Sequence, residues 1–250
     1  MKTMTTLGCC DSGLGGLITV HELHLFYPKL NIVYIADQGN APYGDKTLDQ
    51  LNDIAFSVFN TFKKMDIKDV LIACNTLCLT AEYVKKEYPT FNVHTIIEPT
   101  YNQLKGYDFK TINVLATNRT IESHIYGDAL SKLYPNALIR EIKATKLVPI
   151  IENGFDRDLF KEAVNEYCKE DADAWVLGCT HYPLIRPYLK TKGKVFDSII
   201  PIVDLLKTVD ICGEGKVTIY TTKDPEALKQ SIRDILGCEY DVQYIDLKQS

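Results

Sequence analysis

The chain has 250 residues, enough for one large domain or two small ones. Hydrophobic residues make up 46% and charged residues 24%, which is ordinary for a globular protein and argues against disorder. The net charge is −5 and the lysines and arginines are scattered, so we expect no nucleic-acid partner. No apolar run approaches the roughly 20 residues that span a bilayer, and the first residues lack the apolar core of a signal peptide. We therefore expect a cytoplasmic protein with no membrane partner.

Strand-like apolar runs alternate with helical patterns nearly throughout, which is typical of parallel sheets flanked by helices. In the first part we expect strands at 7–10, 31–36, 70–73 and 93–97 and helices at 17–27, 48–65 and 76–88. In the second part we expect strands at 111–116, 137–142, 174–177 and 194–197 and helices at 100–106, 121–133, 147–153, 159–170, 183–189 and 200–209. The tail from 216 to 250 adds a strand, a helix and a strand. The pattern predicts an α/β fold with two similar lobes, each a mainly parallel sheet flanked by helices, and a cleft between them.

Two cysteines have similar surroundings, one in each half of the chain. Cys74 follows the apolar run 70–73, and Cys179 follows the run 174–178. Small polar residues suited to a helix start come after each thiol. We expect both thiols at the carboxyl ends of strands, where open α/β sheets bind ligands and where a helix start lowers a thiol's pKa. Two such thiols facing each other would remove a proton from one face of a carbon and return one to the other.

The remaining cysteines and the histidines suggest no metal site. An even number of cysteines implies disulfides chiefly in short secreted chains, so we expect reduced thiols here. There is no pair of CxxC motifs, and four histidines lack metal-ligand spacing. These histidines are His21, His24, His94 and His124. We expect core packing for Cys78, Cys9, Cys168, Cys212 and Cys238.

Other polar residues lie where strands are expected to end. Asp11 and Ser12 precede a glycine-rich turn that lacks the spacing of a dinucleotide or phosphate loop, and we expect both to face the cleft. The loop 37–46 has glycines and Tyr43, which suit an anionic ligand or a plain connection equally. His181 is either a helix cap or a proton carrier beside Cys179. Glu152 ends an apolar helical stretch, where a solvated carboxylate is the simpler interpretation.

The motifs together resemble the cofactor-independent aspartate/glutamate racemase superfamily, and glutamate racemases within it. The resemblance covers about residues 7–209. The motifs are Asp11-Ser12-Gly13 with Gly15-Gly16, Pro42-Tyr43-Gly44, Ala73-Cys74-Asn75-Thr76, Leu115-Ala116-Thr117, Thr120-Ile121-Glu122-Ser123 with Tyr126, Val148-Pro149 to Glu152, and Leu177-Gly178-Cys179-Thr180-His181-Tyr182-Pro183-Leu184. The chain departs from the family pattern at Gln38-Gly39-Asn40-Ala41, at Thr145-Lys146 and at Ala116.

The resemblance implies a fold with its active site in the cleft between the two lobes, a reaction, and roles for these residues. It implies an N-terminal lobe of residues 1–98 plus 210–250 that carries Cys74, and a C-terminal lobe of residues 99–209 that carries Cys179. It implies interconversion of L- and D-glutamate, which supplies peptidoglycan synthesis, by a homodimer without cofactor or metal. The two thiols would be the acid and base, helped by Asp11, His181 and Glu152. The substrate would be held by Asp11, Ser12, Tyr43, Gly44, Asn75, Thr76, Thr117, Thr120, Thr180 and His181.

Three other functions stay open on the sequence. An aspartate or other amino-acid racemase of the same superfamily would use the same residues. A Cys-His hydrolase built on Cys179 and His181 is less favoured, because residues so close in sequence rarely reach each other as nucleophile and base. A non-enzymatic amino-acid-binding protein would have a similar cleft without α-proton exchange.

Overall fold

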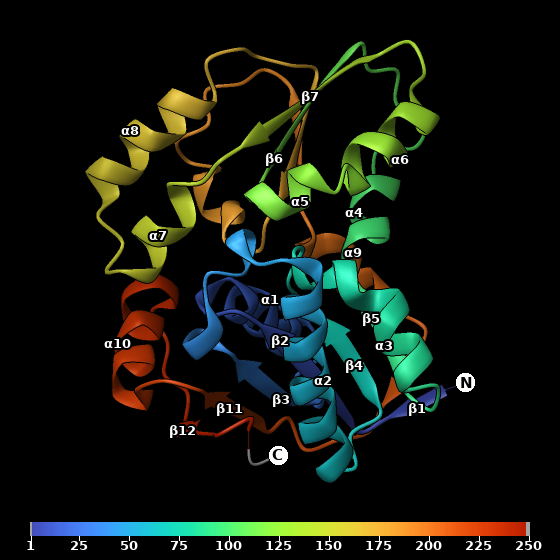
Figure 1. Ribbon diagram of the computed structural model, residues 1–250, viewed down its shortest axis with the longest axis vertical. Coiled ribbons are helices and arrows are strands. Elements are labelled where there is room, and N and C mark those ends of the chain that lie inside the picture. Colours follow the sequence, from blue (N-terminus) through green and yellow to red (C-terminus); the bar gives the residue numbers. More distant parts are fainter. Residues whose placement is uncertain (1, 249–250) are drawn as a thin grey trace.

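Parallel strands form the framework of both lobes of the computed structural model, which describes residues 2–248 (Figure 1). Within that range, one sheet has six strands in the order β12-β11-β3-β2-β4-β5, and we call it the large sheet. Its strands are β2 Thr6–Asp11, β3 Asn31–Ala36, β4 Asp69–Ile72, β5 Asn92–Thr95, β11 Val217–Thr221 and β12 Val242–Tyr244. Every neighbouring pair is parallel. The expected parallel α/β fold is confirmed.

A small sheet forms the second lobe. Its strands among the described residues are ordered β7-β6-β8-β9 and are also parallel. They are β6 Thr111–Ala116, β7 Leu138–Lys143, β8 Ala174–Gly178 and β9 Lys194–Phe196. The central strand β8 is fully buried because Ala174 to Gly178 are apolar on both faces of the sheet.

Helices flank both sheets (Figure 1). The helices around the large sheet are α1 Leu14–Phe26, α2 Leu48–Lys64, α3 Ala81–Glu87 and α10 Pro225–Leu236. The others are α4 Ile97–Asn102, α5 Asn118–Glu122, α6 Ile125–Leu133, α7 Leu147–Glu152, α8 Arg157–Tyr167 and α9 Ile199–Leu205. Helix α2 begins with a capping box, in which the Thr47 side chain accepts from the Gln50 N–H and the Gln50 side chain accepts from the Thr47 N–H.

The chain crosses between the lobes twice. It leaves the large sheet after β5 and enters the second lobe through α4, and it returns through α9 and β10 Val209–Ile211. Strand β10 pairs with β1 Lys2–Met4, and β11 then pairs with β3. The division at residues 98/99 and 209/210 falls inside α4 and at the start of β10 and stays a prediction. In the described part of the chain, no helix is long and apolar enough to cross a membrane.

Several expected elements were wrong in type or length. The helix expected at 76–88 is a 3₁₀ turn, Leu77–Thr80, followed by α3, and the helix expected at 183–189 is only a 3₁₀ turn at Tyr182–Ile185. The helix expected at 121–133 is two helices, because His124 adopts a left-handed backbone (φ 52°) between α5 and α6. The short strands β1 and β10 were missed, since three residues give no readable alternation.

Candidate active site

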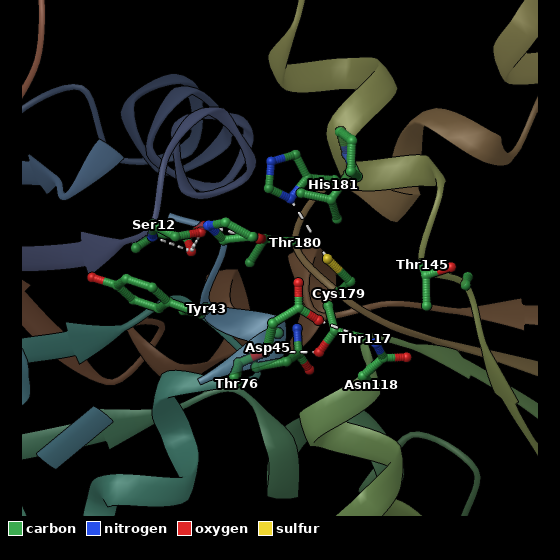
Figure 2. A pocket seen from close by; sticks show the side chains of 18 residues that line it. Ser12, Tyr43, Asp45, Thr76, Thr117, Asn118, Thr145, Cys179, Thr180 and His181 are labelled. Atoms are coloured by element: carbon green, nitrogen blue, oxygen red, sulfur yellow. Dashed lines mark hydrogen bonds between the residues drawn. The ribbon is translucent and has the colours of Figure 1, made fainter. Parts of the chain in front are cut away.

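A cavity of about 370 Å³ lies between the lobes (Figure 2). Both cysteines singled out from the sequence line it. Its other lining residues come from the carboxyl ends of strands of both sheets and from the segments that follow them. They are Asp11, Ser12, Pro42, Tyr43, Gly44, Asp45, Asn75, Thr76, Thr117, Asn118, Ala144, Thr145, Val148, Pro149, Thr180 and His181. The carboxyl ends of parallel strands from the two sheets thus meet at one cavity, as the ligand-site rule for open α/β sheets predicts.

Cys74 follows β4 and is 6% exposed. Burial raises the pKa of its thiol well above the usual value, and the negative charge of Asp11 raises it further. The expectation of a lowered thiol pKa is therefore wrong for Cys74. The short 3₁₀ turn that follows has too few aligned peptide dipoles to offset the loss of water and the neighbouring carboxylate. A thiol in this setting holds its proton and is suited to donate it.

Cys179 has a different neighbour, an imidazole. Its Sγ lies 3.5 Å from His181 Nδ1, and His181 Nε2 lies 2.6 Å from Glu152 Oε1 (Figure 2 shows the first contact). His181 therefore lies beside the thiol, as its interpretation as a proton carrier requires, and closeness in sequence does not prevent the contact that a Cys-His pair needs. The three side chains form a carboxylate–imidazole–thiol chain.

The charges along this chain support one another. Burial lowers the pKa of His181, but the hydrogen bonds and charges of Cys179 and Glu152 outweigh it and hold that pKa well above its usual value. Burial raises the pKa of Glu152, but the bonds from His181 and from the Leu14 N–H outweigh it and lower that pKa. The site thus favours an ionised carboxylate and an imidazolium facing the sulfur of Cys179.

The glycine-rich turn after β2 brings the second lobe against the first. A Cβ at Gly13 would overlap the Glu152 carboxylate, and a Cβ at Gly15 would overlap Thr180 and His181. The first N–H groups of α1 face this side, and Leu14 N donates to Glu152 Oε1 at 2.7 Å. The turn therefore does more than let α1 pack on its strand, since it leaves room for the groups around Cys179.

Asp11 and the threonines form hydrogen bonds across the cleft. Asp11 Oδ1 accepts from the Ser12 N–H at 2.6 Å, and Asp11 Oδ2 accepts from the Thr180 hydroxyl at 2.8 Å. The hydroxyls of Thr76 and Thr117 lie 2.9 Å apart, and both lie within 3.3 Å of the Thr120 hydroxyl. Hydroxyl and carboxylate oxygens of the two lobes are thus hydrogen-bonded to one another around the cavity.

The loop 37–46 contributes Tyr43 and Gly44, as expected. The Tyr43 hydroxyl donates to Asp37 Oδ2 at 2.8 Å, and Asp37 also accepts from Asn40 and Thr222. Asp37 is completely buried, and burial raises its pKa although these hydrogen bonds oppose the shift. The buried Asp37 fixes the loop to the end of β11. The loop is therefore more than a plain connection, because it forms a wall of the cavity.

Most residues predicted for the site line this cavity, with two exceptions. Thr120 lies behind Thr76 and Thr117, and Glu152 lies behind His181 with a side chain only 17% exposed, so it is not the solvated helix end of the simpler interpretation. Sequence reasoning missed several lining residues, which are Pro42, Asp45, Asn118, Ala144, Thr145, Val148 and Pro149. They neighbour predicted residues, but nothing in the sequence shows which neighbours turn inward.

The other cysteines lie outside the cavity lining. All eight cysteines are free. Cys78 is buried with its Sγ 3.3 Å from the Ile72 carbonyl oxygen, and burial raises its pKa to about 12. Cys9 is buried as expected, but the core assignment is wrong for Cys212, which is exposed beyond β10, and only partly correct for Cys168 and Cys238. Among the described residues, no three His, Cys, Asp or Glu side chains are grouped as metal ligands.

Comparison with known proteins decides the family. The family model described as Asp/Glu/Hydantoin racemase matches residues 27–206. The chain belongs to this racemase family. The resemblance seen in its motifs is thereby confirmed, and the protein is an isomerase of the racemase class.

Individual relatives of this racemase match over nearly its whole length. Glutamate racemase 3 of Caldanaerobacter subterraneus subsp. tengcongensis is 34% identical over 266 residues, with 96% of this chain and 95% of the relative covered. The glutamate racemase of Fusobacterium nucleatum is 32% identical over 255 residues, covering 96% and 97% of the two chains. The crystal structure of a glutamate racemase isoform from Bacillus anthracis is 26% identical, with a TM-score of 0.87 over 97% of this racemase and 98% of that chain.

Proposed function

We propose that this racemase interconverts L- and D-glutamate without a cofactor, using Cys74 and Cys179 as acid and base. One observation carries the proposal: two cysteine thiols from different lobes line one cavity, and one has a carboxylate neighbour while the other has an imidazole neighbour. The names of the curated relatives support glutamate as the substrate.

The chemistry requires removal of a very weakly acidic α-proton. The Cys179 thiolate takes the α-proton of L-glutamate, and the electron pair of the broken C–H bond stays on the α-carbon. The Cys74 thiol then gives its proton to the opposite face, which forms D-glutamate and leaves Cys74 as thiolate and Cys179 as thiol. The reverse direction uses the two thiols in exchanged roles. His181 and Glu152 stabilise the Cys179 thiolate, and hydroxyl and amide donors such as Thr76 and Asn75 hold the substrate carboxylates.

The biological setting follows from the proposed product. D-Glutamate is a building block that the family resemblance connects to peptidoglycan synthesis, and we propose this role here. The cytoplasmic location and the homodimer stay predictions. An aspartate racemase of the same superfamily is the nearest alternative, and the ratio of turnover with the two amino acids distinguishes it.

Proton NMR of L-glutamate in D₂O tests the reaction. With pure protein and no added cofactor, we expect the α-proton signal to disappear, because D₂O returns a deuteron to the α-carbon, and we expect optical rotation to fall to zero as D-glutamate forms. Cys74→Ala and Cys179→Ala each remove one of the two bases, and each should suppress racemisation by a factor on the order of 10³ or more. Cys168→Ala, outside the cavity, serves as the control and should keep wild-type turnover. Undiminished racemisation by either cavity variant would refute the two-thiol mechanism.

A further inference from the structure

Tyr126 of α6 lies between the two segments that carry the thiols. Its side chain is buried, and its hydroxyl donates to Asn75 Oδ1 at 2.6 Å. Its ring lies against Gly178, where a Cβ would meet the ring at 3.0 Å. Asn75 follows Cys74 and Gly178 precedes Cys179. One side chain therefore contacts the chain neighbours of both thiols.

The bond from Tyr126 determines which end of the Asn75 amide faces a ligand. Asn75 lines the cavity and is 2% exposed, and its Nδ2 has no hydrogen-bond partner among the described residues. A buried amide N–H₂ without an acceptor is unfavourable, so its natural partner is an oxygen of a bound molecule. Because the Tyr126 hydroxyl occupies Oδ1, turning the amide over would sacrifice that hydrogen bond.

The ring of Tyr126 reaches this position because β8 has no side chain at Gly178. Ala116 of β6 also lies close, since its Cβ would be 3.1 Å from a Cβ at Gly178. The ring fills the space between the β8 backbone and the segment after β4, which belong to different sheets. Such packing sets the separation of the two segments, because a filled interior resists compression.

We propose that Tyr126 is a positioning residue of this racemase. It holds the Asn75 amide with its N–H₂ toward a carboxylate of the substrate, and it keeps Asn75 at a set separation from the segment that carries Cys179. The inference rests on the proposed racemisation of glutamate, because the substrate carboxylate is the acceptor that Asn75 requires.

Tyr126→Phe removes the hydroxyl and keeps the ring. Tyr88→Phe is the matched control, because the Tyr88 hydroxyl also donates to an asparagine Oδ1, that of Asn60, at 3.0 Å and away from the cavity. We expect Tyr126→Phe to raise the KM for glutamate about tenfold or more and to lower kcat/KM at least as much, since a misplaced binding group loses both affinity and alignment. Tyr88→Phe should keep the wild-type KM within about twofold.

The KM separates positioning from a general structural effect. A variant that only reduces the amount of folded enzyme lowers the apparent kcat and leaves KM unchanged. A KM of Tyr126→Phe equal to that of Tyr88→Phe would overturn the inference while leaving the proposed function intact.

A double mutant tests whether Tyr126 acts through Asn75. Adding Tyr126→Phe to Asn75→Ala should change KM little beyond the single Asn75→Ala variant, because the amide that the hydroxyl orients is already gone. Two fully additive effects would contradict this. A wild-type protein that fails to racemise glutamate would refute the proposed function instead, and the affinity of wild type and Tyr126→Phe for glutamate, measured by calorimetry, would then test the positioning role in place of KM.

Discussion

The two thiols differ in their neighbours although they line one cavity. Asp11 and burial hold the proton on Cys74, whereas the His181 imidazolium faces Cys179. A thiol and a thiolate are both needed at the start of each turnover in the proposed mechanism. These neighbours favour a thiol at Cys74 in the resting enzyme and place the His181 ring, rather than a carboxylate, beside Cys179.

The surroundings of Cys74 predict the pH above which activity is lost. Activity is lost when Cys74 also becomes a thiolate, and its raised pKa places this loss above the ordinary thiol value of about 8.5. Asp11→Asn removes the negative neighbour and makes the Cys74 thiolate less unfavourable, so the alkaline limb of kcat/KM should move to lower pH. A pH profile of both proteins measures this.

Asp45→Asn is the control for that profile. It removes a carboxylate that lines the same cavity, but Asp45 is not among the groups that raise the pKa of Cys74. Its alkaline limb should keep the wild-type position. An Asp11→Asn limb that stays in place, or moves to higher pH, would contradict the assignment of Cys74 as the resting thiol.

At the scale of elements, short polar turns after the strands build the site. Cys74 and Cys179 were recognisable because each follows a buried apolar run. The 3₁₀ turns after them were not recognisable, since Thr76 and Thr180 suit a helix start as well as a tight turn. The partners of each side chain were also hidden: Leu14 and Glu152 are 138 positions apart, and sequence spacing alone does not bring them together.

Helix α2 offers a prediction on stability alone. It begins directly after the cavity loop with the capping box of Thr47 and Gln50. Thr47→Ala leaves the Gln50 N–H without its side-chain acceptor, so the free energy of unfolding should fall by about 1 kcal/mol. Urea unfolding measures it, while kcat should stay at the wild-type value because Thr47 does not line the cavity. Ser57→Ala, in the middle of the same helix, should lower the free energy of unfolding less. An equal loss in both variants would show that the capping box does not stabilise the helix.

On the scale of the whole molecule, hydrogen bonds at the site also join the lobes. Glu152 bonds to Leu14, Thr180 to Asp11, and Tyr126 to Asn75. The parallel sheets and the alternation of elements were predictable from the apolar runs. The docking of the lobes was not, because it depends on glycines whose missing side chains admit groups from the other lobe.

The His181–Glu152 pair predicts how stability depends on pH. The raised pKa of His181 contributes to the free energy of unfolding. This contribution is fully present below about pH 6.5, the pKa of a histidine in the unfolded chain, and is lost as pH rises through the pKa of the folded state. The lowered pKa of Glu152 gives a contribution present above about pH 4.3 and lost as pH falls through the folded pKa.

Stability should therefore be highest between these two limits. Glu152→Gln removes the carboxylate. The free energy of unfolding should therefore decline less steeply than in the wild type, both below and above this pH range. Chemical unfolding at a series of pH values tests this, with Glu166→Gln as a control, since Glu166 pairs with Lys146 at the exposed surface. If the pH dependence of the free energy of unfolding were the same in Glu152→Gln as in the wild type, the His181–Glu152 pair would not govern it.

The unequal neighbours of the two thiols have a consequence for the balance of the proposed reaction. Mirror-image amino acids have the same free energy in water, so the equilibrium constant is unity and kcat/KM must be identical in the two directions. The enzyme, however, is not its own mirror image: with Asp11 beside one sulfur and His181 beside the other, its two protonation forms differ in free energy. The enantiomers are then bound and released unequally. As a result kcat and KM differ between L- and D-glutamate, and both differ by the same factor. The asymmetric cavity therefore still produces equal amounts of the two enantiomers at equilibrium.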